Sequence, residues 1–283
     1  MNDSNRSVLA AAREDFHHRL SRDTLVTENG IASNADGDSA ASVRIAHYIA
    51  KSIGAQDGKR PKGQTSGKRF EDACTSFVQD TFLKLVHLRP GQWIVGQAGS
   101  NGIATFDQYS HLIEVENRIQ AIPELKIALG GDYVIKPDVV VTRQPVPDSE
   151  INAKEIFVDK KYGGLSSIRE GDTAVPILHA SISCKWTMRS DRAQNTRSEA
   201  LNLIRNRKGK LPHVVVVTAE PLPTRLASIA LGTGDIDCVY HFALHELIDA
   251  VRNEQPETND LVQMMVAGKR LKDITDLPLD LAV

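Results

Sequence analysis

Two strand-like segments with a helix between them constrain the fold of this sequence more than any other feature. The segments "VPILHASISCKW" (175–186) and "HVVVVTAE" (213–220) are rich in β-branched residues and bounded by Pro or Gly. Between them, residues 190–210 carry a helix start signal at Ser190 or Asp191 and a stop signal at Gly209. A third strand candidate, "KPDVVVTR", covers 136–143. With helix candidates on both sides, the pattern predicts a single α/β domain over 1–283, a central mixed β-sheet flanked by helices.

A basic segment, "DGKRPKGQTSGKR" (57–69), precedes the clearest amphipathic helix. Its glycines and proline predict a loop without regular structure. Two interpretations of its five cations are open, a solvated surface loop and a loop that clasps phosphate. The spacing of Phe70, Phe77 and Phe82 predicts a helix over 70–86, with Glu71 in its first turn. Residues 109–130 are expected to be largely helical, with a break near Pro123.

Composition excludes several classes of protein. Lys and Arg number 34 against 36 acidic residues, a formal net charge of -2, so no global basic field points to nucleic acid and any such signal must be local. The three cysteines are far apart and lack metal-ligand spacing, which favours reduced thiols in a cytoplasm over a disulfide scaffold or a zinc site. No apolar stretch is long enough for a membrane span or a signal sequence. We therefore expect a cytoplasmic protein without membrane contact.

Side-chain alternation divides the strand candidate at 175–186 into two faces. Leu178, Ala180, Ile182, Cys184 and Trp186 form an apolar face, and the polar face carries His179, Ser181, Ser183 and Lys185. Asp138 follows a proline at the start of another strand candidate, from which it could approach Lys185. A carboxylate near a lysine at strand ends is a common arrangement for holding a divalent metal and activating water. An ordinary salt bridge at the edge of a sheet explains the same residues.

The helix that follows adds charged residues to the same end of the strand. Arg192 and Glu199 are seven residues apart and share one face, pointing away from the core. Arginine at a helix start opposes the helix dipole, so helix stability alone does not explain Arg189 and Arg192. Arginine can donate two hydrogen bonds to guanine and aspartate can accept from cytosine, so Arg189, Asp191 and Arg192 suit the reading of G·C pairs. In the alternative, Asp191 or Ser190 caps the helix and the arginines are solvated.

These residues together resemble a known family. The order "PD" (Pro137, Asp138), "SCK" (183–185), "RSDR" (189–192) and a glutamate fourteen residues after the lysine (Glu199) is similar to the PD-(D/E)xK restriction endonucleases specific for CCGG-centred sites. The likeness covers nearly the whole chain, including "SISCKW", "IDCVYHFAL" and "DLPLDLAV". It implies a restriction-endonuclease-like core and a type II restriction enzyme. Such an enzyme cuts a palindromic site, GCCGGC, to leave 5′-phosphate and 3′-hydroxyl ends with four-base 5′ overhangs.

The resemblance also implies roles for particular residues. Position 183, two before the lysine, is usually acidic in the superfamily and is serine here, and Glu199 supplies the missing carboxylate from the downstream helix. One or two Mg²⁺ ions per site would be held by Asp138, Glu71, Glu199 and the main-chain carbonyl of Cys184, while Lys185 acts on the attacking water and the transition state and Ser183 supports it. The base-reading set would be Arg189, Asp191 and Arg192 in the major groove, Gln64 in the minor groove, and Arg225 and Asp36 near the outer base pairs.

The resemblance further implies a two-fold symmetric dimer on double-stranded DNA, assembled into a tetramer, in the cytoplasm of a bacterium. Two other functions are weighed against it. A non-catalytic DNA-binding protein on the same fold is disfavoured because all the expected carboxylates and the lysine are present. An α/β enzyme for a small phosphorylated substrate would want a phosphate-binding glycine-rich loop, and "GQTSGKR" lacks the P-loop spacing.

Overall fold

A six-stranded mixed sheet forms the centre of the computed structural model, which describes residues 6–283 except 123, 125–126, 128–134, 172–173 and 233 and the side chains of residues 190 and 191. The strand order is β3-β4-β5-β6-β7-β8. The antiparallel part comprises β3 (Trp93–Gly96), β4 (Val139–Arg143) and β5 (Ile177–Lys185), and β6 (His213–Thr218), β7 (Cys238–His241) and β8 (Leu271–Asp273) continue parallel to β5. The predicted α/β fold with a mixed sheet is confirmed, as are the three strand candidates.

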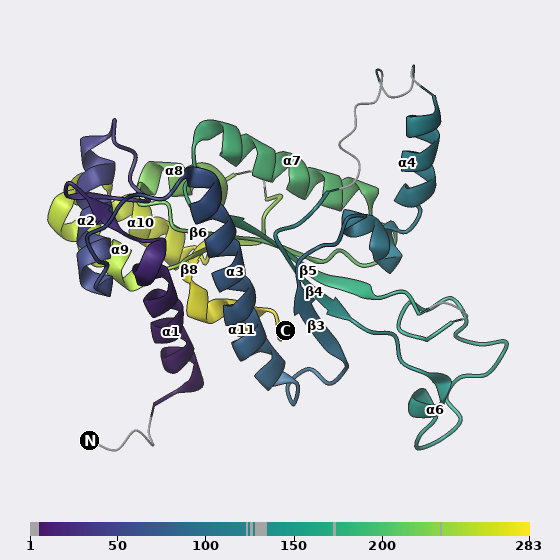
Figure 1. Cartoon of the computed structure of the whole chain (residues 1–283). Coiled ribbons are helices and arrows are strands. Elements are labelled where there is room, and N and C mark those ends of the chain that lie inside the picture. The colour runs from purple at the N-terminus through teal and green to yellow at the C-terminus, as the bar shows by residue number, and fades with distance from the viewer. Residues whose placement is uncertain (1–5, 123, 125–126, 128–134, 172–173, 233) are drawn as a thin grey trace.

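Helices cover the sheet on both sides (Figure 1). One long helix, α3 (Gly63–Phe82), packs across β3, β4 and β5, and α1 (Val8–Asp23) lies beside it. The crossover between β5 and β6 is α7 (Ser190–Asn206), and that between β6 and β7 is α8 (Pro223–Ala230). The other α-helices within the described residues are α2 (Ala40–Ile53), α4 (Leu112–Ala121), α6 (Asp148–Ile151), α9 (Leu244–Glu254), α10 (Asn259–Ala267) and α11 (Leu277–Asp280).

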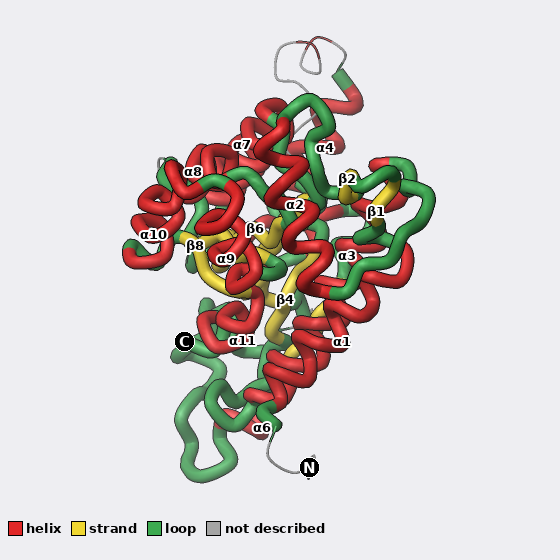
Figure 2. The backbone as a smooth tube through the Cα atoms, turned by 90° about the vertical axis from the view of Figure 1, so that its left-hand side faces the viewer, coloured by secondary structure: helices red, strands yellow, loops and turns green. Residues whose placement is uncertain are grey.

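Short elements complete the chain. A two-stranded hairpin, β1 (Thr27–Glu28) and β2 (Ile31–Ala32), precedes α2. Single turns of 3₁₀ helix are η2 (Leu83–Leu85), η3 (Gly102–Thr105), η4 (Asp107–Tyr109), η5 (Pro256–Thr258) and η6 (Ile274–Asp276). Between β4 and β5 the chain projects away from the body as a long segment that contains α6, and both views show it standing clear of the sheet (Figures 1 and 2). We call residues 144–171 the protruding segment.

The prediction of a loop over 57–69 is wrong for its second half. Helix α3 begins at Gly63, so "GQTSGKR" is helical and Glu71 lies more than two turns inside the helix instead of in its first turn. Ser66 and Phe70 are buried on one face of this stretch. Burial against neighbouring elements therefore overrides the low helix propensity of Gly63 and Gly67.

Three of the five cations of the basic segment bind the protein itself. The guanidinium of Arg60 donates to the main-chain oxygens of Ser33, at 2.9 Å, and Ala35, at 2.6 Å. Lys68 lies 3.1 Å from a carboxylate oxygen of Asp72, and Arg69 donates to the main-chain oxygen of Asp23 at 2.7 Å. Arg60 thereby fastens the start of the basic segment to residues 33–35, so the segment is structured at both of its ends.

Alternation along β5 holds near its carboxyl end and fails at its start. The apolar positions from Leu178 to Trp186 are all buried, as expected. At His179, however, the pairing with β4 shifts register, and the imidazole stacks on Phe82 at the end of α3. A β-bulge redirects a side chain to the other face of the sheet, which is why His179 leaves the polar row. The predicted break near Pro123 lies outside the described residues.

Among the described residues, no helix combines the length and apolar character needed to cross a membrane.

Candidate active site

An ion pair joins the start of β4 to the end of β5. Asp138 directly precedes β4, and the antiparallel pairing of Val139 with Ile182 carries it to the carboxyl end of β5. One carboxylate oxygen of Asp138 accepts hydrogen bonds from the main-chain N–H of Cys184, at 2.7 Å, and from Nζ of Lys185, at 3.0 Å. Both side chains are only 19% exposed. Asp138 and Lys185, which the sequence singled out as candidates, are therefore in direct contact at a partly buried position.

The charges of Asp138 and Lys185 shift the pKa values of two glutamates on different helices. Burial raises the pKa of Glu199 on α7, and the Asp138 carboxylate raises it further, against the opposing effect of Lys185. Burial likewise raises the pKa of Glu71 on α3, again with a contribution from Asp138. The nearby cations Lys68 and Lys185 act in the opposite direction on Glu71. Glu71, Asp138, Lys185 and Glu199 thus form one electrostatic cluster, which we call the carboxylate cluster.

Lys185 is held in its charged form. Burial alone would lower the pKa of this ammonium group, but the carboxylates of Asp138 and Glu199 more than offset that effect and the pKa lies above its usual range. A lysine in this state donates hydrogen bonds and stabilises negative charge, and it is a poor general base at neutral pH. Beside it, the hydroxyl oxygen of Ser183 is buried and has no hydrogen-bond partner.

The donor set suits a hard divalent cation. Mg²⁺ prefers oxygen ligands and usually binds one or two carboxylates together with substrate phosphates and water. Glu71 and Glu199, whose pKa values are raised by burial and by the Asp138 carboxylate, would gain from a nearby cation. Within the described part of the chain no three His, Cys, Asp or Glu side chains are grouped closely enough to hold a metal by themselves. The cluster therefore fits an ion that takes further ligands from phosphate, water or the main chain beside Cys184.

A second group of sequence-predicted residues surrounds a hollow of about 360 Å³ next to the cluster. Its walls include Asp36, Arg189, Arg192 and Arg225. Arg192 donates to the hydroxyl of Thr187 at 3.1 Å, and Arg225 forms an ion pair with Asp36 that lowers the pKa of that carboxyl group. We call this hollow the reading cleft.

Two predicted reading residues are not placed there. Gln64 is exposed in the first turn of α3 and does not line the reading cleft, although its neighbours Gly63 and Ser66 do. Asp191 lies in the first turn of α7, but its side chain is outside the described residues.

The capping interpretation of the helix start is wrong. The N-cap of α7 is Arg189, which makes no side-chain capping hydrogen bond, and the helix begins at Ser190. Neither Ser190 nor Asp191 therefore occupies the N-cap position. The turn that leads into the helix, from Thr187 to Arg189, is instead fixed from outside.

Glu220, a residue that sequence reasoning missed, supplies that support. It lies just beyond β6, is fully buried, and its two carboxylate oxygens accept the main-chain N–H groups of Met188, at 2.7 Å, and Leu222, at 3.1 Å. The guanidinium of Arg225 is 3.8 Å from the same carboxylate. The signal in the sequence was an acidic residue in the otherwise apolar run "VVVVTAEPLP", which predicts a buried carboxylate that needs N–H partners.

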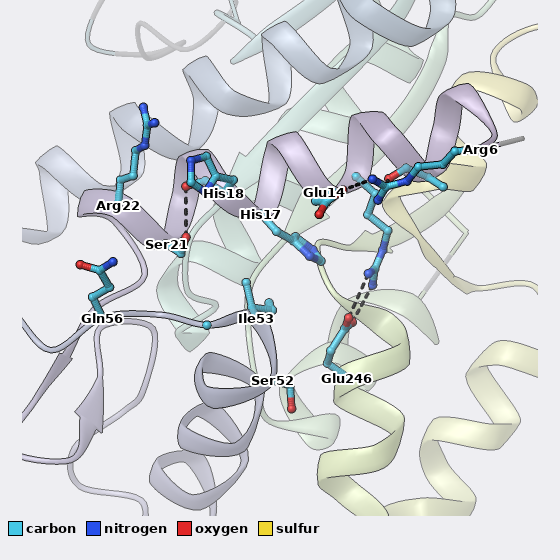
Figure 3. Close-up of a pocket in the computed structure, with 13 residues that line it drawn as sticks. Arg6, Glu14, His17, His18, Ser21, Arg22, Ser52, Ile53, Gln56 and Glu246 are labelled. Carbon is cyan, nitrogen blue, oxygen red and sulfur yellow. Dashed lines mark hydrogen bonds and ion pairs between the residues drawn. The ribbon is translucent and has the colours of Figure 1, made fainter. Parts of the chain in front are cut away.

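Another hollow, of about 560 Å³, lies between α1 and the end of α2, and its wall includes Arg6, Glu14 and Glu246 (Figure 3). Two of the three arginines in its wall are paired, Arg13 with Glu246 at 2.9 Å and Arg6 with Glu14. None of the sequence-predicted site residues lines it. The hollow therefore belongs to the packing of the N-terminal helices.

Comparison with known proteins gives two matches. The sequence model of the family described as NgoMIV restriction enzyme matches residues 16–283. The chain is also 53% identical over 278 residues to the type II restriction enzyme NgoMIV of Neisseria gonorrhoeae, an alignment that covers 96% of this chain and 97% of that protein.

The buried Glu220 carboxylate gives a stability prediction. Glu220→Ala leaves the Met188 N–H buried without an acceptor and should lower the free energy of unfolding by about 1–3 kcal/mol. Because burial raises the pKa of Glu220, its protonated form favours folding. The stabilisation from protonated Glu220 is complete below the pKa that this group has in the unfolded chain. It is lost as the pH rises through the higher pKa of Glu220 in the folded protein.

Urea denaturation between pH 4 and pH 8 measures this effect. Glu220→Gln cannot ionise, so it should lose less stability than wild type as pH rises over that interval. Glu114→Gln, an exposed position on α4, serves as the control and should follow wild type. Parallel curves for wild type and Glu220→Gln would contradict the assignment.

Proposed function

Because this chain belongs to the NgoMIV restriction enzyme family and is a type II restriction endonuclease, we propose that it cleaves double-stranded DNA at a palindromic CCGG-centred site, GCCGGC. Hydrolysis leaves 5′-phosphate and 3′-hydroxyl ends with four-base 5′ overhangs, in the cytoplasm of a bacterium. The observation that carries the proposal is the contact of Asp138 with Lys185, whose neighbour in the chain, Trp186, lines the same cleft as Arg189, Arg192 and Arg225. A positive charge that can act on the reacting phosphate is thus close to hydrogen-bond donors that can reach base edges.

The proposed cofactor is Mg²⁺, one or two ions per active site. Asp138 and the main-chain carbonyl of Cys184 would bind it directly, and Glu71 and Glu199 would complete the site through bridging water molecules. Bound Mg²⁺ would supply Lewis-acid stabilisation of the phosphate and a more acidic water molecule.

The chain's own groups have separable tasks in this proposal. The Lys185 ammonium, kept charged by Asp138 and Glu199, stabilises the negative charge that develops on the scissile phosphate. Asp138 holds Lys185 in place, and the unpartnered hydroxyl of Ser183 is available to the phosphate or to a water molecule. Water attacks phosphorus in line, and the 3′ oxygen departs.

Base reading falls to the residues at the start of α7 and around the reading cleft. Arg189 and Arg192 donate to guanines of the central CCGG and Asp191 accepts from cytosines. Arg225 and Asp36, which pair with each other in the free protein, lie near the outer base pairs. Gln64, exposed at the start of α3, reaches the minor groove. Arginines that gain no favourable interaction from the helix dipole would gain guanine acceptors in the complex.

Self-association completes the proposal. A palindromic site calls for two subunits related by two-fold symmetry, and two such dimers form a tetramer. The protruding segment carries large apolar side chains exposed to solvent: Ile156 at 86%, Phe157 at 75%, Tyr162 at 64% and Leu165 at 103%. Such a concentration on a projecting segment is typical of a protein–protein contact.

Plasmid digestion tests the activity. With Mg²⁺, plasmids containing GCCGGC should be cut once per site, and plasmids without it should stay intact. Lys185→Ala should abolish cleavage yet still bind the cognate duplex in Ca²⁺, because the ammonium acts on the transition state. Lys84→Ala, an exposed lysine, is the control.

Sequencing the product ends gives the stagger. Cleavage at random positions would show a nonspecific nuclease instead. Specific binding without any cleavage in Mg²⁺ would show a non-catalytic DNA-binding protein.

Arg192→Ala should weaken binding to the cognate duplex by about 1–3 kcal/mol, the value of one bidentate guanine contact. Arg205→Ala, exposed in the last turn of the same helix, should bind like wild type. Fluorescence anisotropy in Ca²⁺ at fixed salt measures both. An equal loss for cognate and unrelated duplexes would assign Arg192 to phosphate instead of base.

Light scattering tests the assembly. We expect a tetramer mass for wild type and a smaller assembly for Phe157→Ser/Leu165→Ser. Val8→Ser removes a similarly exposed apolar side chain from α1 and should leave the mass unchanged. A monomer mass for wild type would refute self-association.

A further inference from the structure

A group of cations lies at the far end of β4 and β5, away from Asp138 and Lys185. Asp138 directly precedes β4 and Arg143 ends that strand, while Lys185 ends β5 and Ile177, the partner of Arg143, begins it. Eight residues separate Ile177 from Lys185, about 26 Å at roughly 3.3 Å per residue. A hollow of about 320 Å³ opens at this far end, beside Arg89, Trp93, Arg143 and Lys210. We call it the arginine pocket.

Two guanidinium groups share one aromatic ring in the arginine pocket. The guanidinium carbons of Arg89 and Arg143 lie 5.5 Å and 5.6 Å from the centre of the Trp93 ring. Burial lowers the pKa of Arg89, and the positive charge of Arg143 lowers it further. Like charges placed this close cost free energy unless something else offsets them. The ring offsets part of that cost through cation–π attraction.

The protein supplies no side-chain carboxylate to these cations. Arg13, Arg169 and Arg225 each form an ion pair with an acidic side chain, whereas among the described residues Arg89, Arg143 and Lys210 form none. Among the described residues, Arg143 donates to the main-chain oxygen of Pro90, at 3.2 Å, and Arg89 donates to an oxygen of Val283, the last residue of the sequence. Asp107 accepts from the hydroxyl of Ser167 in the pocket wall, at 2.5 Å, and Asp237 and Asp280 act electrostatically on His213 in the same wall.

Unsatisfied donors give an independent sign of a missing ligand. The Nε atoms of Arg89 and Arg143 are both buried and without a hydrogen-bond partner. Buried polar groups are nearly always paired in folded proteins, so two unpaired guanidinium nitrogens beside one hollow indicate that the described chain offers too few acceptors to these arginines.

Backbone geometry builds this arrangement. Gly91 adopts a φ of +147°, and a Cβ added there would lie 2.9 Å from Nε of Arg143 and 3.3 Å from Nε1 of Trp93. Arg143 can therefore lie against the bare main chain only because residue 91 is glycine. The indole N–H donates to the main-chain oxygen of Arg89 at 2.9 Å, which fixes the ring between the two cations.

From this geometry we propose that the arginine pocket binds a multiply charged oxyanion of the phosphate class. Two guanidinium forks and one ammonium group match an anion with several oxygens and more than one negative charge. The volume suits a ligand at the small end of the usual range. Ser166 and Ser167 in the wall belong to the protruding segment, so a bound anion would connect the base of that segment to the sheet. Free phosphate and a backbone phosphate of nucleic acid share this chemistry.

Calorimetric titration of the full-length protein with inorganic phosphate tests the proposal. Metal is removed with EDTA, and chloride keeps the ionic strength constant. Arg143→Gln should bind phosphate more weakly by on the order of tenfold, because it loses charge-assisted hydrogen bonds. Arg192→Gln removes a cation from the reading cleft and should bind phosphate like wild type. Lys210→Gln lies at an exposed position before β6 and gives a second variant that should fold normally and bind more weakly.

The outcomes are distinct. Loss of phosphate binding in Arg192→Gln but not in Arg143→Gln and Lys210→Gln would place the anion in the reading cleft and overturn the proposal, as would equal affinity in all variants. If Arg143→Gln and Lys210→Gln also weaken binding to a duplex without CCGG, the pocket takes backbone phosphate. If duplex binding is unchanged while phosphate binding falls, it takes a free anion. Cleavage of GCCGGC is measured separately, so failure here leaves the proposed endonuclease activity untouched.

Discussion

The mixed pairing of β5 is the constraint on which the rest of the molecule depends. Antiparallel pairing with β4 brings Asp138 to the carboxyl end of β5, where it meets Lys185. Parallel pairing with β6 requires a crossover, so α7 must start at that same end. The crossover supplies Glu199, Arg192 in its first turn and Arg189 at its N-cap. β6 ends beside Lys185, whose main-chain oxygen accepts from the Thr218 hydroxyl at 2.8 Å. One strand with two pairing directions thus gathers the candidate catalytic and reading residues.

The two ends of β5 carry opposite imbalances of charge. At the carboxyl end, Lys185 is surrounded by carboxylates, and the cluster keeps it protonated while two glutamates bear a raised pKa. At the amino end, two arginines and a lysine have no acidic side-chain partner among the described residues. The first arrangement holds excess negative charge that a cation would relieve, and the second holds excess positive charge that an anion would relieve. Opposite imbalances in one sheet account for both ligand proposals.

The positions of the candidate reading residues depend on buried polar contacts outside their own helix. Glu220 binds the N–H of Met188, and Arg60 fastens the loop that contains Asp36 through the carbonyls of Ser33 and Ala35. Arg225 connects these two supports, because its guanidinium approaches both Glu220 and Asp36. Side chains held in this way lose little conformational freedom on binding, which favours specific recognition.

The sequence by itself determined the α/β class, the three central strands and the residues Asp138, Ser183, Lys185 and Glu199, because strand alternation and helical periodicity are local properties of the chain. The order and spacing of the motifs along the chain indicated the family, because they too can be read without the folded structure. Tertiary structure decided what local pattern cannot contain. Helix α3 starts at Gly63 because Ser66 and Phe70 are buried against other elements, and His179 changes face because β4 and β5 pair through a bulge. Glu220 and the arginine pocket emerge only when residues far apart in the chain are packed together, since a partner, or its absence, is a property of the folded neighbourhood.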